Sequence, residues 1–229
     1  MKIIKRLLLA GSLIGLLLLT LLLFVVFTEV GLRSLVSLAN SLSGGFLSLG
    51  SASGTLLGPL QLRHIRYGDG TNTVLVDTLD FDWHPGQLLR GRVDLRVIEG
   101  KQVRIALGAG AEEEPTTETG EIVLPPFSLP LDFLLDRFQA SDIVLSSQDQ
   151  VLQRIESVHL AKLRFRGDQL TFADLSLVSS GNRIQLKGGL QTNAQYLING
   201  ALKTRLALEG YGPVAATANL SGPLNHLKI

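Results

Sequence analysis

The chain contains no cysteine, which excludes disulfide bonds and every metal or nucleophile site built on a thiolate. Aromatic residues make up only 6% of the sequence and charged residues only 18%, while 45% is hydrophobic. The formal net charge of +1 offers none of the strongly basic surface that a nucleic-acid binding protein needs. An aliphatic surplus with so few aromatics indicates a smooth apolar surface rather than a densely packed aromatic core.

Catalytic motifs are missing as well. No H-x-x-x-H spacing joins the four scattered histidines, and no G-x-S-x-G nucleophile elbow is present. Gly68–Gly70 and Gly188–Gly189 lack the Lys-Ser/Thr of a phosphate loop and are predicted to be hairpin turns. Asp80 and Asp82 share one strand face with no base or metal partner. The sequence therefore predicts a protein that is not an enzyme and holds no metal or cofactor.

One long uncharged run occupies the N-terminal region, from Leu7 to Phe27. About 20 apolar residues at ~1.5 Å per residue span the ~30 Å hydrocarbon core of a bilayer. Three basic residues precede the run and only Arg33, near Glu29, closely follows it, which places the N-terminus in the cytoplasm. A cleaved signal peptide is the alternative, but its apolar core would be only ~7–15 residues with an A-x-A site after it. The run is longer and its exit lacks that pattern, so an uncleaved signal anchor is predicted.

A short amphipathic helix is predicted directly after the anchor. Leu32, Leu35, Val36 and Ala39 recur at helical spacing, and Gly44–Gly45 ends the pattern. The expected organisation is a tail and anchor at 1–29, this helix at 30–45, a first sheet segment at 46–107, an insert at 108–130 and a second sheet segment at 131–229.

Strand patterning dominates the rest of the chain. Apolar and polar residues alternate at a period of two, which is typical of a sheet with one apolar face. The parity of the apolar residues switches near His64 and again near Asp77, as a bulge would produce. Turns are predicted at 68–70, 84–86, 99–101, 167–168 and 180–182.

The stretch from Gly108 to Pro130 breaks the alternation. Three successive glutamates and several prolines cannot bury enough apolar area to offset their ordering entropy, which predicts a solvated loop. An acidic docking segment is the alternative. Leu131, Leu134, Leu135 and Phe138 then have helical spacing and predict a second short amphipathic helix. The alternating pattern still continues near Ile229, which predicts that the sheet extends in a longer protein.

The apolar face of this sheet must be covered by something, because the predicted helices are too short for so many strands. A sandwich or small barrel with a dry core is one solution, and a curved open sheet whose inner face shelters lipid is the other. The pattern leaves both open. The residues expected to line such a groove are Leu60, Leu62, Leu79, Phe81, Trp83, Val93, Leu95, Val97, Val103, Ile105, Leu107, Ile143, Leu145, Val158, Leu160, Leu175, Leu177, Ile184, Leu186, Leu206 and Leu208.

Two segments carry a resemblance to a known family. GTLLGPLQLRHIRYGDG at 54–70, followed by VLVDTLDFDW at 74–83, resembles the opening repeat of TamB proteins, within the AsmA-like and bridge-like lipid-transfer group. The order of parts agrees too, from basic tail and anchor through the amphipathic helix and acidic insert to ASDIVLSSQDQVLQRIESVHLAKLRF at 140–165. The resemblance covers essentially the whole chain, and its motifs are patterns of glycine, proline and aliphatic residues.

The resemblance implies a mainly β protein, elongated and curved like a β-taco, anchored in the inner membrane with its body in the periplasm. It implies phospholipid transport towards the outer membrane and a TamA-like Omp85 barrel partner, met through a C-terminal region that this sequence lacks. A scaffold for outer-membrane protein assembly is one alternative. A closed lipopolysaccharide-binding jellyroll resembling LptC, another bitopic periplasmic protein, is the other.

Overall fold

The computed structural model describes residues 27–108, 127–147, 150–192, 196–208 and 212–223, except for the side chain of Leu208. Its elements are α2 (Glu29–Leu42), β1 (Leu47–Gly54), β2 (Leu60–Gly68), β3 (Thr73–Trp83), the 3₁₀ helix η1 (Pro85–Arg90), β4 (Arg92–Leu107), β5 (Leu129–Ser147), β6 (Gln150–Gly167), β7 (Gln169–Ser179), β8 (Asn182–Gln191), β9 (Leu197–Leu208) and β10 (Gly212–Pro223). The mainly β prediction is confirmed.

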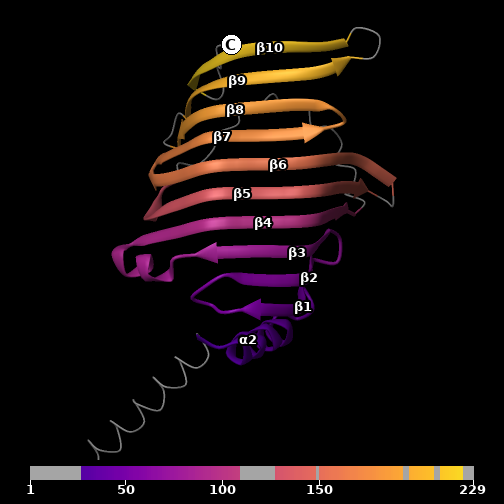
Figure 1. Ribbon diagram of the computed structural model, residues 1–229, viewed down its shortest axis with the longest axis vertical. Helices are drawn as coiled ribbons and strands as arrows, with labels where there is room; N and C mark the ends of the chain where they lie inside the picture. Colours follow the sequence, from indigo (N-terminus) through magenta and orange to yellow (C-terminus); the bar gives the residue numbers. More distant parts are fainter. Residues whose placement is uncertain (1–26, 109–126, 148–149, 193–195, 209–211, 224–229) are drawn as a thin grey trace, which may run out of the picture.

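All ten described strands form one sheet whose spatial order follows the chain, β1 to β10 (Figure 1). Every neighbouring pair is antiparallel except β4 and β5, which are parallel. Extensive contacts in the described part of the chain join only sequence neighbours, so no second sheet lies on the first. These strands therefore form an open sheet and neither a sandwich nor a jellyroll.

The helix predicted after the anchor is confirmed as α2, and it lies along the outer edge of β1. Asn40 mimics a strand there: its Nδ2 donates to Leu49 O (3.0 Å) and its Oδ1 accepts from Leu49 N (2.8 Å). The Ser43 hydroxyl donates to Leu47 O (2.8 Å). An unpaired edge strand is a template for foreign strands, and these side chains occupy part of the β1 edge.

The second predicted helix is wrong, because Leu131–Phe138 lies inside the strand β5. Leu135 and Phe138 are three apart, yet they pair with Leu95 and Ile98, which belong to the same face of β4. A strand with an inserted residue places side chains three apart on one face, which a helix also does. The sequence spacing therefore had two structural solutions.

Two predicted turns are also wrong. Glu99–Lys101 lies within β4, which runs unbroken from Arg92 to Leu107, and Gly188–Gly189 lies within β8. Glycine and polar residues there mark bends within strands instead of reversals of the chain. The turns expected at 68–70, 167–168 and 180–182 connect consecutive strands as predicted, and η1 begins at Pro85.

The parity switches at His64 and Asp77 belong to a single crease across the sheet. The registers align His64 with Asp77, then with Gln102 and Asp142 on the next strands. His64, Gln102 and Asp142 have φ of 53°, 55° and 54°, a left-handed conformation that costs about 1–3 kcal/mol per residue and persists only where the surroundings impose it. Recurrence on three strands shows that the ladder imposes it.

A second crease crosses the sheet nearer to the other strand ends. β3 and β4 shift register between Asp82 and Trp83, which leaves Arg96 without a ladder partner, and Lys162 in β6 has φ of 52°. Bulges of this kind bend strands and increase their twist.

The predicted anchor lies almost entirely in residues 1–26, outside the described residues, as does most of the predicted insert, at 109–126. Within the described ranges, no helix has the length and apolar character needed to cross a membrane.

Candidate functional site: the apolar face of the sheet

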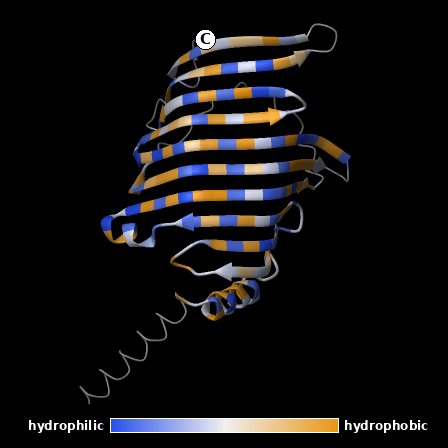
Figure 2. Ribbon diagram, in the orientation of Figure 1, coloured by the Kyte–Doolittle hydropathy of each residue, from blue (hydrophilic) through white to orange (hydrophobic). Residues whose placement is uncertain are grey.

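Cross-strand partners point to the same side of a sheet, so the registers define two faces. The side of the sheet that carries Leu62, Leu79 and their cross-strand partners is called the apolar face. On β6 to β8 the same face continues through Leu160, Leu175 and Leu186. No charged side chain occupies an apolar-face ladder position in the described strands. Figure 2 shows the alternation of hydrophobic and hydrophilic residues along each strand.

Most of the predicted lining residues lie on the apolar face by register. Val97 does not: it pairs with Asp82 and Arg137 on the opposite face, because the bulge at Arg96 reverses parity before it. The side chain of Leu208 lies outside the described residues. Apolar-face residues that the predicted set lacked include Leu49, Ile65, Val74, Val76, Ile98, Phe133, Leu135, Phe138, Ile155, Leu163, Phe165, Leu170, Phe172, Leu190, Ile198 and Leu202.

The sheet bends towards the apolar face. Leu95, Leu135 and Ala140 are buried although no second layer of described elements covers them. At Gly100 a Cβ would lie 3.7 to 4.0 Å from side-chain atoms of Val103, Val76 and Leu79. These distances are ordinary van der Waals contacts, so neighbouring side chains close over the glycine. No side chain in the described part is completely buried, which fits an open concave surface.

The opposite face is polar, and its charges pair across strands. Arg96 contacts Asp82 (3.2 Å), Arg166 contacts Asp132 (3.4 Å), and His159 contacts Asp174 (3.6 Å). The two arginine pairs are partly exposed, and surface ion pairs contribute only about 0.2–1 kcal/mol each. Their arrangement makes one side of the sheet hydrophilic and leaves the other without charge.

The apolar face has a notch where Gly188 of β8 lies beside Gly200 of β9. Gly188 pairs with Gly200, so two neighbouring positions on the face lack side chains. A Cβ on Gly188 would lie 2.2 Å from Asn199 O, and one on Gly200 would lie 2.5 Å from Lys187 O, so the close backbones require glycine. A cavity of about 750 Å³ opens here, lined in part by Leu170, Leu190 and Ile198. Its size falls in the range of small-molecule sites.

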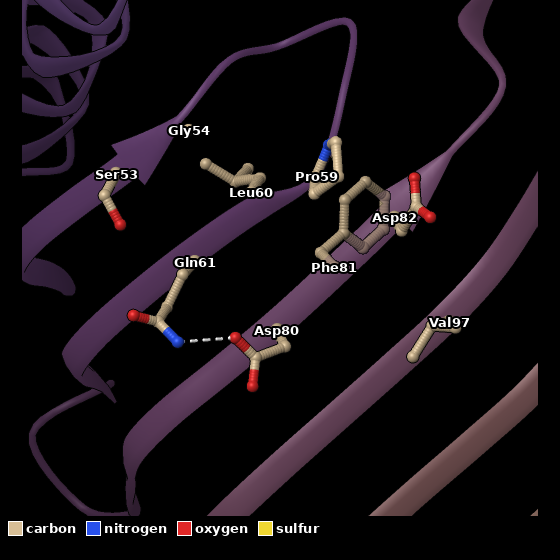
Figure 3. A pocket seen from close by; sticks show the side chains of 9 residues that line it. All are labelled: Ser53, Gly54, Pro59, Leu60, Gln61, Asp80, Phe81, Asp82 and Val97. Atoms are coloured by element: carbon tan, nitrogen blue, oxygen red, sulfur yellow. Dashed lines mark hydrogen bonds between the residues drawn. The ribbon is translucent and has the colours of Figure 1, made fainter.

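A smaller hollow of about 290 Å³ lies where β2 begins, among β1, β3 and β4 (Figure 3). Gln61 Nε2 donates to Asp80 Oδ1 (2.7 Å) there, and Leu60 pairs with Phe81 on the apolar face. Trp83 ends this row, with its ring 6.1 Å from that of Phe81 and its Nε1 donating to Leu56 O (2.8 Å). Trp83 thus combines an apolar-face position with a satisfied polar atom.

One aromatic side chain reaches the apolar face from outside the strands. The Phe127 ring stacks on Phe165, with ring centroids 5.6 Å apart. Phe127 N donates to Thr192 O (2.9 Å), and the buried Thr192 hydroxyl donates to Phe127 O and Asp168 O. This tie fixes the segment before β5 beside the end of β8 and the turn between β6 and β7.

The turn between β2 and β3 is held by Asp69. Its Oδ1 accepts from Asn72 N (2.6 Å) and Thr71 N (2.9 Å). These hydrogen bonds, from Asn72 first and Thr71 second, lower the pKa of Asp69 below its ordinary value because they stabilise the carboxylate.

Residues 18–126 match the family model described as TamB, N-terminal domain. This stretch is similar to a TamB N-terminal domain. The resemblance expected from the sequence is thereby confirmed. In the structure, this TamB domain includes α2 and β1 to β4, and the same sheet continues without interruption from β4 into β5 and on to β10. Comparisons with curated proteins and with solved structures gave no match.

Proposed function

We propose that this TamB-domain protein is the part of a lipid-transfer bridge that is anchored in the inner membrane. It shields phospholipid acyl chains on the apolar face of its sheet as they move towards the outer membrane. It acts by binding and guiding, without catalytic chemistry or a cofactor. The observation that carries the proposal is a continuous, uncharged, concave apolar face with no described element covering it.

The energetic requirement is specific. Transfer of an acyl chain of about 16 methylenes from an apolar medium into water costs on the order of 10 kcal/mol of free energy, at ~0.8 kcal/mol per CH₂. A lipid crossing an aqueous space therefore needs apolar contact along the whole route. Ten strands in chain order offer such contact, because aliphatic residues recur on the same face of each neighbouring strand.

The TamB match supports a membrane context and a TamA-like Omp85 barrel as a partner. We infer that Leu7–Phe27 is the single membrane anchor, with the N-terminus in the cytoplasm and the sheet in the periplasm. Lipid would then enter at β1, the strand nearest to the anchor in the chain, and travel towards β10. No residue of this chain is assigned to the barrel contact.

The path can be tested by blocking it between entry and detection. A photo-crosslinking amino acid at Leu186, on β8, should capture phospholipid in cells. Ile105→Glu places a charge on the apolar face of β4, upstream of β8, and should abolish that capture. Ala106→Glu is the matched control, because Ala106 is exposed on the polar face. Capture at Leu186 that survives Ile105→Glu at normal protein levels would contradict transport along the sheet.

A scaffold for outer-membrane protein assembly is the second candidate, and one observation favours it. Among the described strands β10 pairs only with β9, so its other edge presents free backbone groups for strand addition. Successive residues of an antiparallel strand direct their N–H groups to opposite edges. Prolines placed singly at Ala215 and Ala216 therefore disturb opposite edges. The scaffold would be favoured if one of these prolines abolishes the capture of client proteins while Ile105→Glu leaves that capture intact.

A further inference from the structure

The outward side of α2 carries an apolar row that nothing described in the structure covers. Val30, Ser34, Leu38 and Leu42 follow one another at intervals of four, which places them in one slowly turning row on the helix surface. Val30 and Leu38 are more than half exposed, and Leu42 is 76% exposed. Phe27 precedes the helix and Phe46 follows it, and both are more than half exposed. Five large apolar side chains thus gather on and beside one helix.

The polar groups along this row need no water. The Ser34 hydroxyl donates to Val30 O (2.9 Å), and the neighbouring Ser41 hydroxyl donates to Ser37 O (2.9 Å). Such bonds to the carbonyl four residues earlier satisfy serine hydroxyls within the helix itself. The two charges of α2 pair with each other, because Arg33 Nη2 lies 3.6 Å from Glu29 Oε2. The Ser34 and Ser41 hydroxyls can therefore enter an apolar medium with their hydrogen bonds already made.

The other flank of α2 is committed to the sheet. Asn40 and Ser43 bond to the edge of β1, and Leu32 is buried. Gly54 N also donates to Glu29 Oε1 (3.4 Å). The helix is therefore held on β1 from its first turn to its last, and the apolar row has a fixed orientation relative to the first strand.

We propose that the apolar row of α2 lies in the lipid interface of the bilayer and thereby seats the β1 end of the sheet on the membrane surface. Phe27, which precedes the row, is the last residue of the uncharged run from Leu7, so in sequence the row directly follows the proposed anchor. An amphipathic helix that lies in the interface buries its apolar side among headgroups and upper acyl chains. This inference rests on the proposed anchor, but it concerns α2 and not the lipid path along the sheet.

The absence of cysteine makes a direct test possible, since single cysteines can be introduced without removing any. The full chain is reconstituted in phosphatidylethanolamine–phosphatidylglycerol nanodiscs, with nitroxide labels at L38C, L42C or R104C. Labels at Leu38 and Leu42 should be reached by oxygen in preference to a water-soluble nickel chelate. A label at Arg104, on the polar face of β4, should show the reverse preference.

Two outcomes separate this inference from the proposed function. If the chain is retained in the nanodiscs but the labels at Leu38 and Leu42 meet the nickel chelate as freely as the label at Arg104, the inference is overturned and the anchor stands. If the chain does not enter the nanodiscs, the anchor itself is wrong and the inference falls with it. Circular dichroism of each labelled variant confirms that the sheet is intact before either result is read.

Discussion

Asn40→Ala tests whether α2 holds the edge of β1. The substitution removes both side-chain hydrogen bonds to Leu49, at 3.0 Å and 2.8 Å, and introduces alanine, which favours the helix. A net hydrogen bond contributes about 1 kcal/mol, so the pair is worth about 2 kcal/mol. Because 1.4 kcal/mol is a factor of ten, the local opening of α2 from β1 should become about thirty-fold more frequent.

Amide hydrogen exchange measures this opening directly, because the Leu49 N–H donates to Asn40 in the intact protein. We expect exchange at Leu49 to accelerate about thirty-fold in Asn40→Ala, with no change in the strands from β5 onward. Ser41→Ala is the control, since its hydroxyl bonds only within the helix. Equal exchange at Leu49 in wild type and Asn40→Ala, or equal acceleration in Ser41→Ala, would refute the edge-capping account.

Three further predictions concern the rest of the sheet. Gly188→Ala should lower the free energy of unfolding by at least about 2 kcal/mol in denaturant titrations, because the new Cβ would lie 2.2 Å from a carbonyl oxygen, whereas Gly86→Ala, with open space around it, should change it by less than about 0.5 kcal/mol. Thr192→Val should cost about 1 kcal/mol and speed exchange at the Phe127 amide, since the hydroxyl that bonds to Phe127 O and Asp168 O is lost. The pKa of Asp69 is lowered in the folded state, so the carboxylate should stabilise the turn fully above about pH 3.8. The turn should loosen as the pH falls through the lowered pKa of the folded state. Amide chemical shifts of the turn should therefore titrate with a midpoint below 3.8.

Local alternation was enough to predict the sheet and its apolar face. The spacing between Leu62 and Ile65 also located the bend at His64, where the backbone is left-handed. The same three-residue spacing between Leu131 and Phe138 led to the wrong prediction of a helix, because a bulged strand and a helix share this spacing. A short sequence window cannot distinguish the two, and pairing with β4 and β6 decides for the strand.

Other features depend on pairing between distant segments. The parallel pairing of β4 with β5 makes Glu99–Lys101 a stretch of strand, although glycine and charge there favour a turn. The bulge at Arg96 moves Val97 to the polar face, a position that the hydrophobicity of valine does not predict. Whether the apolar face is covered by a second sheet is a tertiary property, which alternation along single strands does not encode.

The central claim is that the face of the sheet, and not the hydrophobicity of a residue, decides contact with lipid. Leu177 and Val178 are adjacent aliphatic residues on β7, but Leu177 pairs with Val158 and Ile184 on the apolar face, while Val178 pairs with Ser157 and Arg183 on the polar face. Photo-crosslinkers placed at each position in cells measure contact with phospholipid directly. The account predicts lipid adducts at Leu177 and none at Val178, and equal labelling at both positions would contradict it.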